Sequence, residues 1–186
     1  MKLRASILEL GGRLAASALL CLGLFHSPQP YAQSSGPVPN VIAWGANSFG
    51  QTSVPGMLTD ATSIATGWRH SLALKSGGTV VAWGDNSYGQ CAVPAGLINV
   101  IAIATGSGAV HNLALRNDGT VVGWGANGFN NYGQTTPPAG LSGVVAISAG
   151  GTFSTALKSD GTVVAWGWNI FGQVTPPVGL SGVVAI

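Results

Sequence analysis

The dipeptide Trp-Gly recurs four times along the chain at nearly constant intervals, and this repetition constrains the fold more than any other feature of the sequence. The tryptophans are Trp44, Trp83, Trp124 and Trp166, and the steps between them are 39, 41 and 42 residues. A period near forty residues predicts a repeat architecture, in which each copy forms one small unit that packs against its neighbours.

The chain divides into four units when it is aligned on these tryptophans. The units span residues 41–76, 77–117, 118–159 and 160–186, and the last is incomplete. Each unit carries three strand signals, which are short, rich in β-branched residues and bounded by Gly, Pro, Asn or Asp. One set is Thr79–Trp83, Val100–Ala104 and Asn112–Leu115. A weaker segment, Gln90–Pro94, is a candidate for a fourth strand at the sheet edge, where its proline is tolerated.

These signals predict an all-β fold made of small antiparallel sheets. Both alternating positions of the strands are apolar, so we expect each sheet to be covered on both faces by its neighbours. The turns at Lys75–Gly78, Arg116–Gly119 and Lys158–Gly161 have the Gly residues that hairpins need. Following the chain through these hairpins places two sets of connections on one edge, which we call the loop edge. They are the loops after each Trp-Gly and the turns before each Leu-Ala-Leu strand.

The lengths of the connections differ between the two edges of the sheets. The count from Leu to the following Thr is always 5, and the count from Pro to Ile is always 9. By contrast, the count from Ile to Leu is 10, 12 and 10, and the count from Trp to Gln is 7, 7, 10 and 7. Every insertion therefore lies on the loop edge. Variable loops on a rigid scaffold are where binding residues concentrate.

Composition and charge exclude two classes of protein. Charged residues make up 6% of the chain, but 46% of the residues are hydrophobic and form regular runs, which excludes a disordered chain. Three of the seven basic residues, Lys2, Arg4 and Arg13, precede the repeats together with Glu9, so the repeats hold four basic and four acidic residues. The repeats are therefore neutral, and no basic surface for nucleic acid is expected.

The first 32 residues have the features of a secretory signal peptide. Basic residues precede an apolar core, Leu14–Phe25, which is too short to span a bilayer, and cleavage is expected after Ala32. Residues 33–40 have the Pro, Gly and Ser content of a linker. We therefore expect a secreted or periplasmic protein without a membrane span after signal removal. Cys91 would be its one remaining cysteine, so no internal disulfide can form.

The repeated residues resemble a known family. The pattern Trp-Gly-x-Asn-x-x-Gly-Gln, then Gly-x-x-His-Ser-Leu-Ala-Leu-Lys and Asp-Gly-Thr-Val-x-Ala-Trp-Gly, is similar to the regulator of chromosome condensation repeat, whose family forms β-propellers. The resemblance covers residues 41–186 and implies about four short antiparallel blades, as part of a seven-bladed ring. Because the fourth unit stops at Ile186, we expect a fragment of a longer protein.

The resemblance also implies several functions. The short period and the segment Val93–Gly96 resemble bacterial exported members, among them a propeller-type β-lactamase inhibitor that binds its enzyme through loops on one edge. A second hypothesis, independent of the resemblance, is that the repeats are an accessory region of a larger exported enzyme. A third is guanine-nucleotide exchange, against which the signal peptide and the neutral charge argue.

Residues that differ between copies on the loop edge are the candidates for partner binding. They are Trp68, Arg69, Asp85, Phe129, Asn130, Trp168 and Ile170. Tryptophan and arginine are favoured at binding hot spots, and exposed aromatic loop residues need an explanation. The alternative is that Trp68 and Trp168 only cover the ends of the blades. We predict a non-catalytic module that binds a protein partner through this edge.

Residues that fill the same slot in every copy are expected to maintain the fold. They are Asn47, Asn86, Asn127 and Asn169, then Gln51, Gln90, Gln134 and Gln173, and the aromatic residues Phe49, Tyr88, Tyr132 and Phe171. We expect the amides to close turns by hydrogen bonding. A position on the rim would let some of the aromatic rings contact a partner as well.

The sequence offers little support for catalysis. His70 precedes Ser71, and Asp60 and Asp85 are available, but the slot of His70 holds His111 and Phe153 in other copies, which favours a packing role. Neither metal-ligand spacing nor a phosphate-binding loop is present, so we expect no metal and no cofactor.

Overall fold

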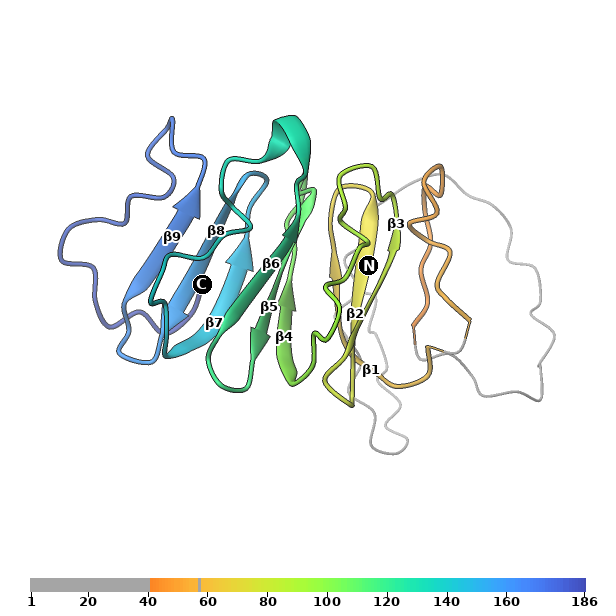
Figure 1. The fold of residues 1–186 in the computed structure, drawn as a ribbon, viewed down its shortest axis with the longest axis horizontal. Coiled ribbons are helices and arrows are strands. Elements are labelled where there is room, and N and C mark those ends of the chain that lie inside the picture. Colours follow the sequence, from red (N-terminus) through yellow and green to blue (C-terminus); the bar gives the residue numbers. More distant parts are fainter. Residues whose placement is uncertain (1–40, 57) are drawn as a thin grey trace, which may run out of the picture.

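Nine strands form three antiparallel sheets in the residues that the computed structural model describes, which are 41–56 and 58–186. The first sheet contains β1 (Ala61–Thr66), β2 (His70–Lys75) and β3 (Val80–Gly84), the second β4 (Val100–Ala104), β5 (His111–Arg116) and β6 (Val121–Gly125), and the third β7 (Val144–Ala149), β8 (Phe153–Lys158) and β9 (Val163–Gly167). A short 3₁₀ helix, η1, spans Gly128–Asn130. The sheets lie side by side along the long axis of the molecule (Figure 1).

Each sheet combines two strands of one unit with the tryptophan strand of the next. The strand order is sequential in all three sheets, as the hairpin signals predict. The strand expected at Val100–Ala104 has the predicted bounds, and those expected at Thr79–Trp83 and Asn112–Leu115 are β3 and β5 with ends shifted by one residue. The all-β prediction is confirmed, and the architecture is that of partial β-propeller blades.

The expected fourth strand at Gln90–Pro94 is wrong. The backbone N–H groups of this segment bond locally, Ala92 to the Gly89 carbonyl at 3.1 Å and Val93 to the Cys91 carbonyl at 3.0 Å. The Gln90 carbonyl accepts side-chain hydrogen bonds instead of a ladder bond. The segment therefore turns after each Trp-Gly loop rather than extending a sheet.

The hydrophobic core lies between the sheets. Leu72 and Leu74 on β2 pack against Val100 and Trp124 of the second sheet. The same arrangement repeats between the second and third sheets, where Leu113 and Leu115 pack against Val144, Ala156 and Trp166. This confirms the prediction that neighbouring sheets cover each other's faces.

The indoles of the repeated tryptophans link each sheet to the preceding loop. The Nε1–H groups of Trp83, Trp124 and Trp166 donate to the carbonyls of Gln51, Gln90 and Gln134 at 3.0, 3.1 and 2.8 Å. Contacts between adjacent sheets are made mainly by the first and second strands, with β1 and β2 near β4, and β4 and β5 near β7. The sheets therefore lie closest along the edge formed by β1, β4 and β7.

Two segments that the repeat alignment pairs with strands are not strands in the structure. Residues 41–44 and 183–186 have no assigned strand, so the described residues contain three complete sheets. The predicted signal peptide and linker, residues 1–40, lie outside the described residues. Within the described part, no helix is long and apolar enough to cross a membrane.

Candidate functional site

The backbone register places the two sets of variable connections on one edge, as predicted. In each sheet the first residue of the second strand pairs with the glycine of Trp-Gly: His70 with Gly84, His111 with Gly125 and Phe153 with Gly167. The loops that follow β6 and β9 both lie at the top of the molecule in Figure 1, together with η1. The loop edge comprises residues 46–51, 67–69, 85–90, 105–110, 126–134, 150–152 and 168–173.

Backbone hydrogen bonds hold the two loop sets of each sheet together. Asp85 N–H donates to the Arg69 carbonyl at 2.9 Å, and Trp168 N–H donates to the Thr152 carbonyl at 3.0 Å. Between sheets, Trp68 N–H donates to the Ala109 carbonyl at 3.2 Å. The loops are therefore fixed relative to one another by main-chain bonds that do not depend on the variable side chains.

The repeated glutamines close their loops, as the sequence predicts. The Oε1 atoms of Gln51, Gln90, Gln134 and Gln173 accept from the backbone N–H of the aromatic residue two positions earlier, at 2.7–2.9 Å. Three of the repeated asparagines act in the same way. Asn47, Asn86 and Asn169 accept from the backbone N–H five residues later at 2.8–3.0 Å.

Asn127 departs from this pattern, which corrects the prediction for the third unit. The loop after Trp124 is three residues longer, and no side-chain hydrogen bond of Asn127 closes it. Instead Asn131 Oδ1 accepts from Gly133 N–H at 3.0 Å, and Gln134 Nε2 donates to the Asn130 carbonyl at 2.6 Å. The insertion displaces the asparagine from the turn that it closes in the other copies.

An aromatic cluster with a stacked guanidinium lies on the loop edge of the first sheet. The Arg69 guanidinium carbon lies 3.8 Å from the centre of the Trp68 ring and 4.1 Å from the centre of the Phe49 ring. Trp68 is 53% exposed and Phe49 is 41% exposed, whereas Arg69 is half-buried. Trp68 and Arg69 thus lie together as predicted, with Phe49 as a third member.

Asp85 lies beside this cluster but is held by its own loop. Its Oδ1 accepts from the Ser87 N–H at 3.0 Å and from the Ser87 hydroxyl at 2.6 Å. These hydrogen bonds lower the pKa of the Asp85 carboxyl below its ordinary value, and the charge of Arg69 lowers it further. The carboxylate is therefore ionised at neutral pH, and one of its oxygens is occupied within the loop.

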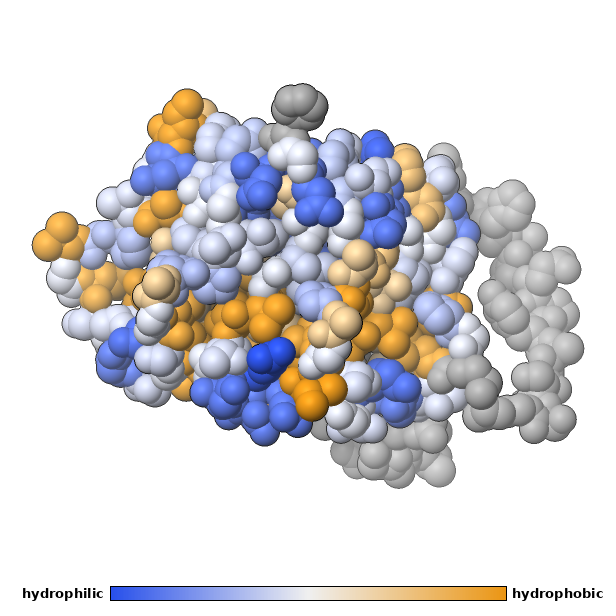
Figure 2. Space-filling view, viewed as in Figure 1, coloured by the Kyte–Doolittle hydropathy of each residue, from blue (hydrophilic) through white to orange (hydrophobic). Residues whose placement is uncertain are grey.

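A second aromatic cluster lies on the loop edge of the third sheet. The Trp168 ring lies 5.7 Å from the Tyr132 ring and 5.5 Å from the Phe171 ring, the latter in an edge-on arrangement. Tyr132 is 45% exposed and Phe171 is 81% exposed. Ile170, the neighbour of Phe171, is 68% exposed, and hydrophobic surface is visible at the tip of the loop after β9 (Figure 2).

The loop edge of the second sheet lacks an aromatic cluster of this kind. The slots of Trp68, Arg69 and Trp168 are filled here by Ala109, Val110 and Ala126. All three residues are buried. Asn130 of the insertion is half-buried, with its carbonyl bonded to Gln134. Phe129 lies in η1, and its side chain is outside what the structure describes. Between the two aromatic clusters, the slots that correspond to Trp68, Arg69 and Trp168 therefore hold buried aliphatic residues.

The aromatic residues of the repeated slot contribute to the site more than the sequence analysis proposed. An aromatic residue in every copy predicts a role in the fold for Phe49, Tyr132 and Phe171, and their rings also belong to the two exposed clusters. Their backbones maintain the loop and their rings remain at the surface. The sequence feature that indicates this surface position is that each aromatic residue directly precedes the loop glycine.

The His70-Ser71 pair is not arranged for nucleophilic catalysis. The Ser71 hydroxyl donates to the Gln51 carbonyl at 3.0 Å, and His70 Nε2 lies 2.7 Å from Asn112 Oδ1 in the next sheet. Asp60 forms an ion pair with Lys75 at 3.4 Å on the opposite edge. The histidine therefore links neighbouring sheets, as the packing prediction requires.

His111 repeats this role one sheet later. Its Nε2 lies 3.0 Å from Ser154 Oγ on β8, and its side chain is fully buried. Burial lowers the pKa of His111 from its ordinary value of 6.5 to about 4, and burial also lowers the pKa of His70. Both rings are therefore neutral in the folded protein at neutral pH.

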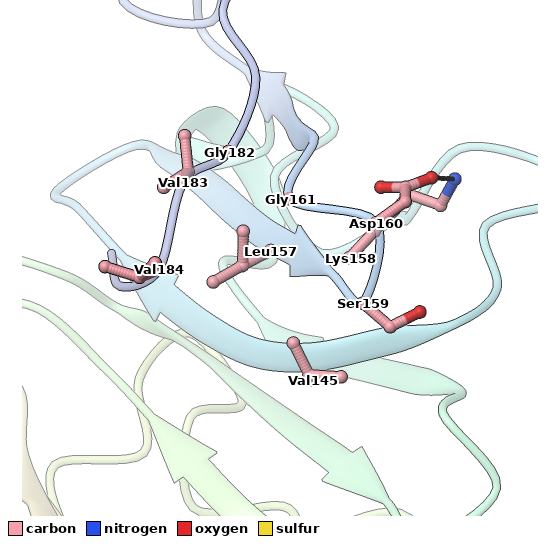
Figure 3. Close-up of a pocket in the computed structure, with 9 residues that line it drawn as sticks. All are labelled: Val145, Leu157, Lys158, Ser159, Asp160, Gly161, Gly182, Val183 and Val184. Carbon is pink, nitrogen blue, oxygen red and sulfur yellow. Dashed lines mark hydrogen bonds and ion pairs between the residues drawn. The ribbon is translucent and has the colours of Figure 1, made fainter.

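Three further features of the described residues bear on chemistry. Burial raises the pKa of the Cys91 thiol to about 11, so it is protonated at neutral pH. Within residues 41–56 and 58–186, no three His, Cys, Asp or Glu side chains are grouped closely enough to hold a metal ion. A hollow of about 500 Å³ lies on the opposite edge, where Leu157 faces Val183 and Val184 and the Lys158–Asp160 ion pair lies at the rim (Figure 3).

Comparisons with known proteins agree with the repeat pattern. The family model described as the regulator of chromosome condensation (RCC1) repeat matches residues 61–90 and 144–173. No curated protein matches the chain significantly. Solved structures do match it, and the matching part of this chain covers less than half of each of those described below.

Three solved structures illustrate the similarity. Human WBSCR16 matches with a TM-score of 0.54 and 24% identity over 67% of this chain and 42% of that chain. Prp20p from Saccharomyces cerevisiae is described with its binding properties to Gsp1p and histones. It matches with a TM-score of 0.51 and 26% identity over 63% of this chain and 33% of that chain. Yeast RCC1 (Prp20), in the structure with Kap60 bound, matches with a TM-score of 0.52 and 21% identity over 68% of this chain and 39% of that chain.

Proposed function

Since this chain is made of regulator of chromosome condensation repeats and belongs to that β-propeller family, we propose that it binds a protein partner through its loop edge. In this proposal the repeats are a non-catalytic, exported module. The sheets act as a scaffold, and the clusters around Trp68 and Trp168 are the two anchoring points of the interface.

One observation carries the proposal: exposed aromatic rings gather on the edge where the loops vary. Of the five exposed aromatic side chains among the described residues, only Trp44 lies off this edge. The others are Phe49, Trp68, Tyr132 and Phe171. Aromatic and arginine side chains dominate binding hot spots, and rings held by neighbouring loops lose little conformational freedom on binding.

The comparisons support protein binding as the class of function. Prp20p is described with binding properties to Gsp1p and histones, and a second structure shows the yeast protein bound to Kap60. For this chain, the class of partner is inferred from the residues of its own loop edge. Its exposed residues combine large apolar side chains, Phe49, Trp68, Tyr132, Ile170 and Phe171, with Asn and Ser side chains. Arg69 and Asp85, both half-buried, are its two charges.

The test is a comparison of captured proteins. The full chain and a Trp68→Ala/Trp168→Ala variant are immobilised, exposed to the secreted proteins of the source culture, and the retained proteins are quantified by mass spectrometry. We expect at least one protein to be retained by the wild type and lost from the variant. Each anchor is expected to contribute about 2 kcal/mol or more to binding.

A matched control separates the loop edge from general hydrophobicity. Ile98 lies before β4 on the opposite edge and is 53% exposed, like Trp68. Ile98→Ala is expected to retain the same protein as the wild type. Equal retention by all three proteins, or loss with Ile98→Ala alone, would contradict the proposed site.

Export is tested separately. If the leader is a signal peptide, the protein recovered outside the cytoplasm begins at Gln33, after cleavage following Ala32. N-terminal sequencing of the mature protein checks this. Recovery of the protein only in the cytoplasm with Lys2 still present would contradict export.

A further inference from the structure

Arg69 is the one basic residue on the loop edge within the described part of the chain. The other three, Lys75, Arg116 and Lys158, each end the second strand of a sheet and lie on the opposite edge. Lys75 pairs with Asp60 at 3.4 Å, and Lys158 pairs with Asp160 at 2.9 Å. Arg69 therefore differs from the other cations in its position.

The aromatic rings hold the Arg69 guanidinium in a defined plane. Its central carbon lies 3.8 Å from the centre of the Trp68 ring and 4.1 Å from that of Phe49, and these rings come from two different loops. An arginine stacked on aromatic faces keeps its N–H donors at the edge of the guanidinium plane. Among the described residues, Arg69 has no side-chain hydrogen bond and no ion pair.

Asp85 does not occupy these donors. The two residues are joined through their backbones, with Asp85 N–H donating to the Arg69 carbonyl at 2.9 Å. The Asp85 carboxylate is turned toward Ser87, from which it accepts two hydrogen bonds. The guanidinium is thus fixed in place beside an acid that does not neutralise it through a direct contact.

We propose that Arg69 binds a carboxylate of the protein partner, an Asp or Glu side chain, while Trp68 and Phe49 pack against apolar atoms next to it. This inference rests on the proposed function, because it names the chemistry that the same loop edge recognises. A planar guanidinium matches a planar carboxylate with two parallel hydrogen bonds. Because stacking already restricts the arginine, little freedom is lost on pairing.

The same surroundings disfavour a phosphorylated partner. Phosphate carries a charge of about −1.5 to −2, and proteins recognise it with clusters of arginines. This edge offers a single cation among the described residues, with the Asp85 carboxylate beside it. The ionised Asp85 repels a phosphate more strongly than a singly charged carboxylate, so the carboxylate is the better match for this single cation.

The first experiment uses benzoate as the probe and the full chain labelled with ¹⁵N. The Nε–H signal of Arg69 is assigned by its loss in Arg69→Lys and followed while benzoate is added. The control is benzamide, which has the same shape but no charge. Arg116 provides an internal reference for general effects on the protein, because it lies on the opposite edge and its Nε is buried away from the probe. We expect the Arg69 signal to shift saturably with benzoate, but not with benzamide.

Two results of this titration would overturn the inference. An Arg69 signal that does not move with benzoate, or that moves no more than Arg116, means that the guanidinium is not available to a carboxylate. A shift of the same size with benzamide would show ring contact without charge pairing, which also contradicts it. This titration needs no identified partner, so it tests whether Arg69 can bind a carboxylate independently of the proposed function.

The second experiment uses the protein retained by the wild-type chain in the capture comparison. Arg69→Gln is expected to raise its dissociation constant by about 10-fold to 100-fold, as expected for losing hydrogen bonds to a charged group. Arg69→Lys is expected to bind more tightly than Arg69→Gln but less tightly than the wild type, because an ammonium lacks the bidentate geometry. If Trp68→Ala and Trp168→Ala weaken binding and Arg69→Gln does not, the binding edge stands and the carboxylate assignment fails.

Discussion

Two parts of the protein, the loop edge and the interior that lies between the sheets, are formed by the same repeats but differ in what their residues do. In the interior, Trp83, Trp124 and Trp166 are all 6–7% exposed and donate to the same kind of glutamine carbonyl. On the loop edge, the slot directly after Trp-Gly holds Asp85, then Ala126, then Trp168. Buried residues that the copies share maintain the scaffold, whereas exposed loop residues on the same fixed backbone are free to serve recognition.

The largest expected effect contrasts two tryptophans. Trp124→Ala removes a buried side chain that packs with Leu72 and Leu97 and leaves the Gln90 carbonyl without its indole donor. We expect a loss of about 3–5 kcal/mol in the free energy of unfolding, measured with denaturant. Trp68→Ala removes a ring that is 53% exposed, so its cost should stay within about 1 kcal/mol. Similar costs for both would break the distinction between the two regions.

The second prediction concerns pH and stays within the interior. The pKa of His111 is about 4 in the folded protein against an ordinary value of 6.5. Between these values the unfolded chain binds more protons, so stability falls as the pH falls from 6.5 to 4. The loss from His111 is about 3 kcal/mol over this window, and His70 adds to it in the same direction.

Phe153 suggests the control, because it occupies the same slot in the third sheet without a titratable group. His111→Phe should flatten much of the dependence of unfolding free energy on pH, leaving the contribution of His70. Urea titrations from pH 7 to pH 4 measure this. An unchanged slope in the variant would show that the buried histidine is not responsible.

The third prediction concerns the loop edge. Trp168→Ala should weaken binding of the captured partner by about 2 kcal/mol or more. Its stability cost should be smaller, about 1 kcal/mol, because it removes ring contacts with Tyr132 and Phe171 at the surface. A calorimetric titration and a denaturant curve on the same sample separate the two effects. A stability loss without a binding loss would assign Trp168 to covering the sheet end.

The smallest expected effect compares two asparagines from one repeated slot. Asn86 Oδ1 accepts from Cys91 N–H at 2.8 Å, whereas no such bond is made by Asn127. Asn86→Ala should cost up to about 1 kcal/mol, and Asn127→Ala less than about 0.5 kcal/mol. Equal costs would indicate that the slot acts alike in every copy despite the longer loop.

Much of the fold could be predicted from the sequence, because the repeat period, the apolar strands and the hairpin glycines all act locally. The common loop edge followed from counting the hairpins, and the register confirms it. The role of Gln90–Pro94 could not be predicted from strand propensity. Its carbonyl at Gln90 accepts from Trp124 and Asn112, which lie more than twenty residues away in sequence.

The candidate site could be predicted only in part. Trp68, Arg69 and Trp168 stood out because they differ from the same slots in other copies. Their partners, Phe49, Tyr132 and Phe171, come from different loops, and only the packing of the sheets brings these rings together. The length of the loop after Trp124 predicts the insertion around Asn130. Its effect on the hydrogen bonding of Asn127 depends on how the longer loop folds.

Hydrogen–deuterium exchange of the complex with the captured partner shows directly whether the loop edge is the binding surface. We expect new protection in residues 46–51, 67–69 and 168–173 on the loop edge, with none in the hairpin turns at 76–79 and 117–119. Protection confined to those hairpin turns, or spread over the outer faces of the sheets, would show that the partner binds elsewhere and would contradict the account.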